Sequence, residues 1–60
     1  MLRVHLKDAD YSLEGVLVGF EAGHYRLAAG RHLEDAGRSR ALEGETWVPR
    51  ENVIYAQVVG

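Results

Sequence analysis

The histidines are the residues of this sixty-residue chain that most readily suggest a metal site. They are His5, His24 and His32, and they fall in three different predicted elements. Common zinc sites draw their ligands from closely spaced histidines and cysteines, and this chain has no cysteine. We therefore predict no metal site, and the sequence indicates no other cofactor.

Nucleophilic catalysis has equally little support in the sequence. Ser12, Ser39 and Thr46 are the serine and threonine side chains, and none lies in a strained-turn motif of the kind that exposes a catalytic serine. Glu43 and Glu45 share a face of a predicted strand, as many solvated carboxylate pairs do. A domain this small also has little room for a concave pocket. We predict that the protein is not an enzyme and has no catalytic residues.

The elements that carry these side chains are predicted to be short strands. Apolar and polar residues alternate over residues 2–7, which indicates a half-buried strand. Residues 13–20 are apolar on both faces and contain Gly15 and Gly19, and glycines inside a strand mark bulges or bends. We expect a long, bent central strand here, buried on both faces or curled so that its faces meet different layers.

Turn residues and composition divide the rest of the chain. Gly23 is expected to take a positive φ in a tight turn, and Pro49 ends a strand because it cannot donate to a ladder. A long loop is predicted at about 30–41, where 32–36 could form a helical turn. The remaining strands are predicted at 24–29, 42–48 and 53–59. Arg31, Arg38 and Arg40 form the main basic cluster of the sequence.

Charge and length limit the classes of partner. Seven Lys and Arg stand against nine Asp and Glu, whereas domains that bind nucleic acid through phosphates usually carry a strong positive balance. No apolar run reaches the length of a membrane span, and residues 1–7 lack the apolar block of a signal peptide. We expect no membrane partner, and a protein that is cytoplasmic or belongs to a particle assembled in the cytoplasm.

The segment from Gly15 to Glu21 carries a resemblance to a known family. It is similar to the first motif of the Sm-like small β-barrels, in which a glycine, a leucine two residues on, an aromatic and an acidic residue hold this spacing. Residues 4–8 resemble the opening strand and turn aspartate of that motif, and residues 48–53 resemble the family's short link between its last two strands. The resemblance implies one all-β domain over residues 1–60, a small, five-stranded, strongly bent antiparallel barrel of the SH3-like and Sm-like kind.

The resemblance also implies where RNA would bind. RNA-binding members form nucleotide pockets from the loop after strand two, which carries an asparagine, and from the link before strand five, which carries an arginine-glycine pair. Here His24 stands in place of the asparagine, and Pro49 and Arg50 in place of the pair. His24 could stack on a base, and Arg50 could meet a phosphate or a base face. An Sm-like RNA-binding ring, contacting RNA through His24, Arg50 and Asn52, is thus the alternative function.

Self-association is the leading expectation. A sixty-residue chain buries only about 60% of its unfolded surface, and small domains without disulfides or metals are commonly stabilised by association. Sm-like rings pair strand four of one subunit with strand five of the next. Trp47 and Tyr55 would either anchor that contact or cap the barrel. The expected interface residues are Trp47, Val53, Ile54, Tyr55, Ala56 and Val58.

The predicted function follows from this assembly. It is a non-enzymatic, self-assembling structural or adaptor module, for example a phage-type component of a virion or capsid. Its expected partners are further copies of itself and other structural proteins, with RNA as the alternative.

Overall fold

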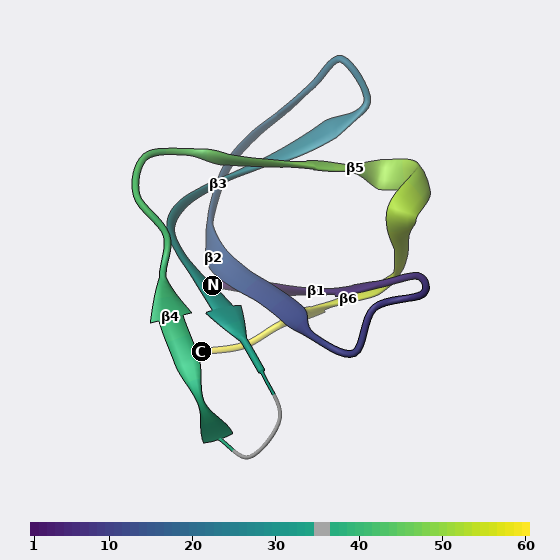
Figure 1. Ribbon diagram of the computed structural model, residues 1–60. Helices are drawn as coiled ribbons and strands as arrows, with labels where there is room; N and C mark the ends of the chain where they lie inside the picture. The colour runs from purple at the N-terminus through teal and green to yellow at the C-terminus, as the bar shows by residue number, and fades with distance from the viewer. Residues whose placement is uncertain (35–36) are drawn as a thin grey trace.

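The computed structural model describes residues 1–34 and 37–60 as a single antiparallel sheet of six strands (Figure 1). The all-β prediction is confirmed, whereas the predicted number of five strands is wrong. The elements are β1 (Leu2–Leu6), β2 (Ser12–Glu21), β3 (His24–Leu33), β4 (Ser39–Ala41), β5 (Thr46–Pro49), the 3-10 turn η2 (Arg50–Asn52) and β6 (Val53–Val58). No helix within the described ranges is long and apolar enough to cross a membrane.

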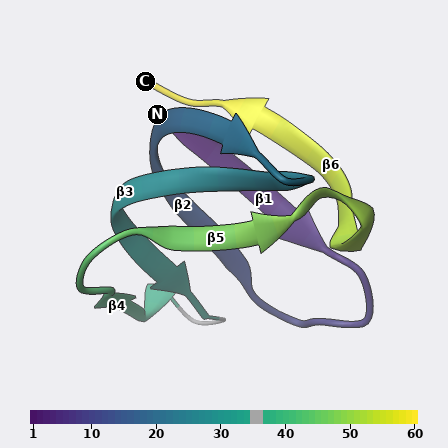
Figure 2. The ribbon, with the colours of Figure 1, turned by 90° about the horizontal axis from the view of Figure 1, so that it is seen from above.

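The order of the strands makes the sheet wrap around itself. The strands pair in the order β4-β3-β2-β1-β6, and β5 pairs with the other half of β3. β5 and β6 are therefore separated by three strands in the sheet, although only η2 joins them along the chain. The sheet must curl to bring these two ends near each other, as Figure 2 shows, but within the described residues no ladder joins β5 to β6 and the sheet stays open.

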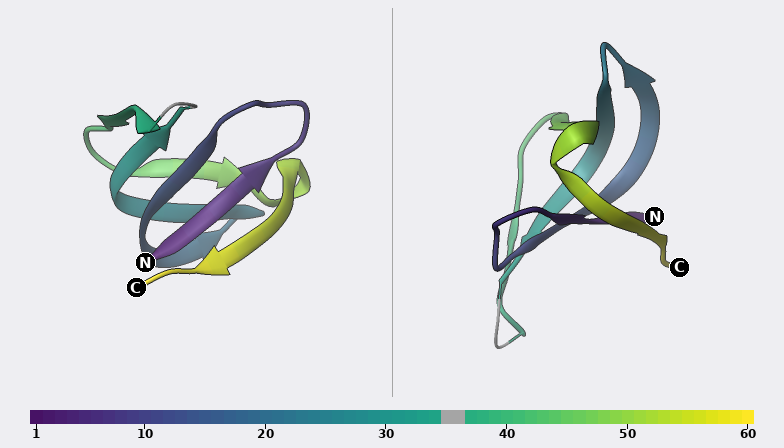
Figure 3. Two further views of the ribbon diagram at one scale, coloured as in Figure 1. Left: turned by 90° about the horizontal axis from the view of Figure 1, so that it is seen from below. Right: turned by 90° about the vertical axis from the view of Figure 1, so that its right-hand side faces the viewer.

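β2 is the bent central strand that the sequence predicted. Its first half pairs with β1 through residues 12–15, and nearly its whole length pairs with β3. Two bulges interrupt the β2–β3 ladder: β3 carries one extra residue at 29–30, opposite Gly15, and β2 carries the extra residue Val18. Ala29 has a φ of 51°, the left-handed conformation found in one common type of bulge. The bulges turn the distal β2–β3 hairpin away from β1, as seen in Figure 3.

The predicted long loop at 30–41 is wrong at both ends. β3 continues through Leu33, and β4 pairs back onto it with Ser39 opposite Leu33. His32 and Leu33 are therefore in a strand and not in the predicted helical turn, whose residues 35–36 lie outside the described residues. The strand predicted at 42–48 begins only at Thr46. The polar composition of this region reflects the solvated position of a short edge hairpin and not the absence of strand pairing.

The core of the molecule is small. Only Val4, Leu27 and Val48 are buried apolar residues among those described, and Leu2, Leu6, Leu13, Tyr25 and Val53 pack against them while partly exposed. Of the two expectations for residues 13–20, burial on both faces is wrong, since Val16, Leu17, Val18 and Phe20 are all about half exposed. These four side chains lie on the distal part of β2, beyond its pairing with β1.

Leu27 and Leu17 provide a matched test of this core. They are directly opposite each other on β3 and β2, but Leu27 is 1% exposed and Leu17 is 47% exposed. We expect Leu27→Ala to lower the free energy of unfolding by about 2–5 kcal/mol through loss of burial and cavity formation. Leu17→Ala should cost about 1 kcal/mol or less. Urea denaturation at low protein concentration measures both values, and equal losses would contradict this description of the core.

Candidate functional site

An open groove lies where the β2–β3 turn meets η2 and the end of β1. It has a volume of about 680 Å³, and its lining includes Lys7, His24, Arg50 and Glu51. The structure thus brings together two of the three residues predicted to bind RNA, His24 and Arg50. Asn52, the third, does not line the groove but follows directly after Glu51 in η2.

Backbone geometry holds the sides of this groove in place. Ala22 and Gly23 both have positive φ, which is the conformation of a tight two-residue hairpin turn, and the predicted positive φ of Gly23 is confirmed. The Arg50 N–H donates to the Gly23 carbonyl at 2.9 Å, so η2 is fixed to this turn. The Lys7 N–H donates to the Asn52 carbonyl at 2.8 Å, which ties η2 to the end of β1 as well.

The side chains of the groove suit an anionic or aromatic group. Nδ1 of His24 lies 2.7 Å from the Ala22 carbonyl, which can only accept, so Nδ1 carries the proton and Nε2 of the neutral ring is left as an acceptor. Lys7 and Arg50 supply two positive charges against the single carboxylate of Glu51. His24 is also close to Trp47, with ring centroids 5.9 Å apart.

The predicted interface residues lie on two strands that are not paired with each other. Trp47 is on β5, and the others are on β6, namely Val53, Ile54, Tyr55, Ala56 and Val58. Trp47, Ile54, Tyr55 and Val58 are all exposed, and Val58 most of all at 88%. Val53 differs, because it packs against the core cluster of its own chain. One chain therefore leaves most of this set uncovered and divides it between the two ends of its sheet.

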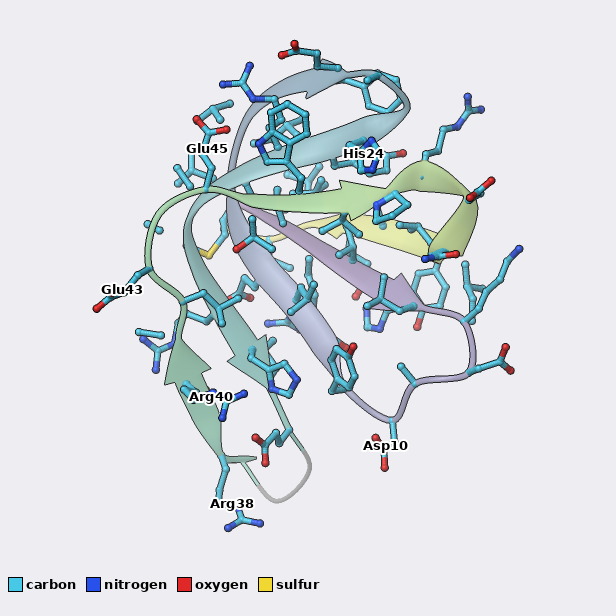
Figure 4. The ribbon with its side chains drawn as sticks, turned by 45° about the horizontal axis from the view of Figure 1, so that its top comes forward. Asp10, His24, Arg38, Arg40, Glu43 and Glu45 are labelled. Carbon is cyan, nitrogen blue, oxygen red and sulfur yellow. The ribbon has the colours of Figure 1, made fainter. Side chains whose placement is uncertain are left out.

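An ionic cluster around Trp47 was not predicted. Glu45 accepts from Arg26 Nε at 2.8 Å and from Arg26 Nη2 at 3.0 Å, and the indole N–H of Trp47 donates to the same carboxylate at 3.0 Å. The Arg26 guanidinium also lies 5.5 Å from the centroid of the Trp47 ring. Gly19 leaves room for Arg26, because a Cβ there would be 3.2 Å from Nη1. In Figure 4, Glu45 is seen at the start of β5 and His24 near its other end.

The cluster is ionised around neutral pH. The hydrogen bond from Arg26, followed by that from Trp47, holds the pKa of Glu45 below its usual value. The bond to Glu45 likewise raises the pKa of Arg26. In the sequence, Glu45 stands out only as a neighbour of Glu43. The partner of Glu45 is Arg26 of β3. The spacing of residues along one strand does not reveal a partner on a neighbouring strand.

His5 joins three strands on the outer face of the sheet. Its Nε2 lies 2.7 Å from the amide oxygen of Gln57 on β6, its Nδ1 lies 3.2 Å from the Ser12 hydroxyl on β2, and its ring stacks on Tyr55 at 4.2 Å. A serine and a histidine are thus in contact, but the group that orients the imidazole is a neutral amide. Ser12 lines neither the groove nor the hollow beside His32. This arrangement ties β6 and β2 to β1.

His32 lies in a second, smaller hollow of about 280 Å³ together with Asp10, Tyr11, Glu34 and Arg38. Its ring stacks on Tyr11 at 4.2 Å, and its Nδ1 is 3.5 Å from a carboxylate oxygen of Glu34. The three histidines thus have separate surroundings. Across the part of the chain that the structure describes, no group of three His, Cys, Asp or Glu side chains could hold a metal ion.

The predicted basic cluster is divided by the β3–β4 hairpin. Arg31 donates to the Ser39 hydroxyl at 2.7 Å. Arg40 is opposite His32, the residue next to Arg31, so its side chain lies on the other face of the hairpin. Arg38 lines the hollow that contains His32. In Figure 4, Arg38 and Arg40 lie at the β4 end of the molecule, away from His24. The three arginines therefore do not form one basic surface.

Comparison of the chain with family models, with curated proteins and with solved structures finds no match.

The Glu45 cluster predicts how the surroundings of Trp47 depend on pH. Because the pKa of Glu45 is depressed, the carboxylate bonds are complete above the ordinary glutamate value of 4.5 and are lost as the pH falls through the lower value in the folded chain. We expect the emission of Trp47 to titrate with a midpoint below 4.5. Trp47 is the sole tryptophan, so fluorescence reports on it directly.

Two variants serve as controls for this titration. Glu45→Gln should remove the transition, while Arg26→Met should move its midpoint upward, because the hydrogen bond from Arg26 that chiefly depresses the pKa of Glu45 is then absent. Glu43→Gln should leave the transition unchanged. A transition that survives in Glu45→Gln would show that another group is responsible.

Proposed function

We propose that this protein is a non-enzymatic, self-assembling module, a structural or adaptor subunit built as a small bent barrel of the Sm-like kind. The observation that carries the proposal is the exposure of β6. Ile54, Tyr55 and Val58 are 61%, 53% and 88% exposed, and a chain with three buried apolar side chains among its described residues has little else to stabilise it. Covering such a strand by association gains apolar burial and removes an aggregation hazard.

The two ends of the sheet supply complementary surfaces for association. Neither the outer side of β5 nor that of β6 is paired with another strand within the described ranges. Pairing β5 of one copy with β6 of the next uses two different surfaces, so it is a heterologous contact. Such contacts close into rings when the rotation permits and otherwise extend, as a capsid or virion component would require.

A charge placed on β6 tests the proposal. We expect the unaltered chain to form a discrete oligomer and Val58→Asp to shift it to the monomer, because an aspartate would have to be desolvated in the contact. Val18→Asp is the matched control: Val18 is also exposed, but it lies in the bulge of β2. Sedimentation velocity over a range of concentrations separates these outcomes. A chain that stays monomeric at high concentration would refute the proposal.

RNA binding is the second candidate, and the groove beside η2 is the observation that favours it. Lys7, His24 and Arg50 meet there across three segments that are distant in the sequence. Two cations can neutralise phosphates, and an imidazole can stack on a base. The single carboxylate Glu51 in the groove and the net charge of −2 oppose tight electrostatic binding.

Oligonucleotide binding distinguishes this second candidate. If the groove binds RNA, a labelled single-stranded oligonucleotide should bind with an affinity that falls as salt rises, and His24→Ala and Arg50→Ala should each weaken it several-fold. Arg38→Ala is the control, because it removes the same charge from the distant β4 end. Fluorescence anisotropy measures all four chains. Equal affinities for Arg50→Ala and Arg38→Ala would exclude the groove as the site.

A further inference from the structure

The backbone groups on the open side of β6 belong to residues with core-facing side chains. The Val59 N–H donates to the Met1 carbonyl at 2.8 Å, and Leu2 is opposite Val58. Because backbone direction alternates along an antiparallel strand, Ala56 and Val58 turn their N–H and C=O groups away from β1. Ala56 is opposite the fully buried Val4, so Ala56 and Val58 present their side chains on the core side of the sheet.

On the open side of β5, by contrast, the backbone groups belong to a residue whose side chain is on the outer face of the sheet. The Arg50 N–H donates to the Gly23 carbonyl, and His24 is opposite Pro49, so the same alternation turns the backbone groups of Trp47 away from β3. The buried side chain of Val48 defines the core face of β5, and Trp47 therefore projects from the outer face. This agrees with its contacts to Arg26 and His24.

We infer that Trp47 of one copy covers the exposed core face of β6 in a second copy. The inference rests on the proposed self-assembly and specifies its contact. In an antiparallel pair, residues that exchange hydrogen bonds are directly opposite and share a face. Antiparallel pairing of β5 with β6 thus places the outward Trp47 on the same side as Ala56 and Val58. The indole of the first copy then packs on the core face of β6, which the second copy leaves exposed.

The available donors and side-chain sizes select one register. The free donor within β5 is that of Trp47, since Pro49 has no N–H, and Glu45 directly precedes the strand. The regular free positions of β6 are Ala56 and Val58. Matching them in antiparallel order sets Trp47 opposite Ala56 and Glu45 opposite Val58. Pro49 then falls at Ile54, where the ladder of β6 with β1 is already interrupted. The largest side chain faces the smallest, between Ile54 and Val58.

Parallel pairing is disfavoured by the same alternation. In a parallel pair, Trp47 would lie on the face of β6 that carries Tyr55 and Gln57. His5 of the second copy already contacts both of those side chains. Val58 would then stay exposed. Glu45 and Arg26 hold the indole in place before association, and the charges of both are already compensated. Less side-chain freedom is therefore lost in the contact.

Disulfide trapping tests the register. Because the chain has no cysteine, any disulfide must join the introduced residues. In the proposed pairing, Thr46 is opposite Gln57 at a non-hydrogen-bonded position, where Cα atoms are about 4.5 Å apart, within the range that a disulfide spans. Thr46→Cys and Gln57→Cys chains, unfolded together, refolded and mildly oxidised, should give a linked dimer. Either variant alone should give none. Thr46→Cys mixed with Val58→Cys is the control, since those side chains lie on opposite faces.

Trp47 fluorescence and sedimentation on the same samples complete the test. The emission of Trp47 should shift to shorter wavelength as the protein associates, and Val58→Asp should abolish the shift. If the chain assembles but Trp47 emission is unchanged, or if Val58→Cys is trapped in place of Gln57→Cys, the inferred contact is wrong and self-assembly stands. If Thr46→Cys or Gln57→Cys dimerises alone, like edges pair and the contact is again wrong. A monomer at high concentration overturns both.

Discussion

The close approach of β2 to β3 at Gly15 is the constraint on which the rest of the structure depends. A Cβ at this position would lie 3.0 Å from the Ala28 carbonyl oxygen, 3.1 Å from the Leu27 Cβ and 3.3 Å from the Gly30 Cα. Only glycine allows the strands to meet this closely beside a bulge. β2 can then end its pairing with β1, turn, and continue with β3, so that Val4 of β1 and Val48 of β5 meet Leu27 in one core.

This bend reduces the apolar surface that the chain can bury. Dividing a sixty-residue chain between two halves of a curled sheet leaves three buried apolar residues among those described and places β5 and β6 at opposite ends. The outer face is held by polar contacts across strands, among them those of His5 and of Arg26. Such contacts position strands and contribute little to the free energy of folding where they are exposed. Both the weak core and the open ends favour association.

The local features of the fold could be predicted from the sequence, and the partners across strands could not. Alternation over residues 2–7, the glycines of β2 and the turn at Gly23 have local causes, and each was found. The β3–β4 hairpin was missed because solvated strands and loops have similar composition. His24 and Arg50 were linked only by the family resemblance, and no spacing rule joins Glu45 to Arg26. Exposure of Leu17 and Phe20 depends on where β1 pairs, which hydrophobicity alone does not reveal.

The two bulges of the β2–β3 hairpin also bear on how the length of this chain can vary. They compensate each other, so the pairing of Phe20 with Tyr25 keeps the register that Glu14 has with Arg31. Deleting Val18 or Ala29 alone would leave one shift uncompensated and would reverse the faces of all residues beyond it. Natural insertions and deletions should accordingly be confined to the turns, while the length of β2 and β3 stays constant.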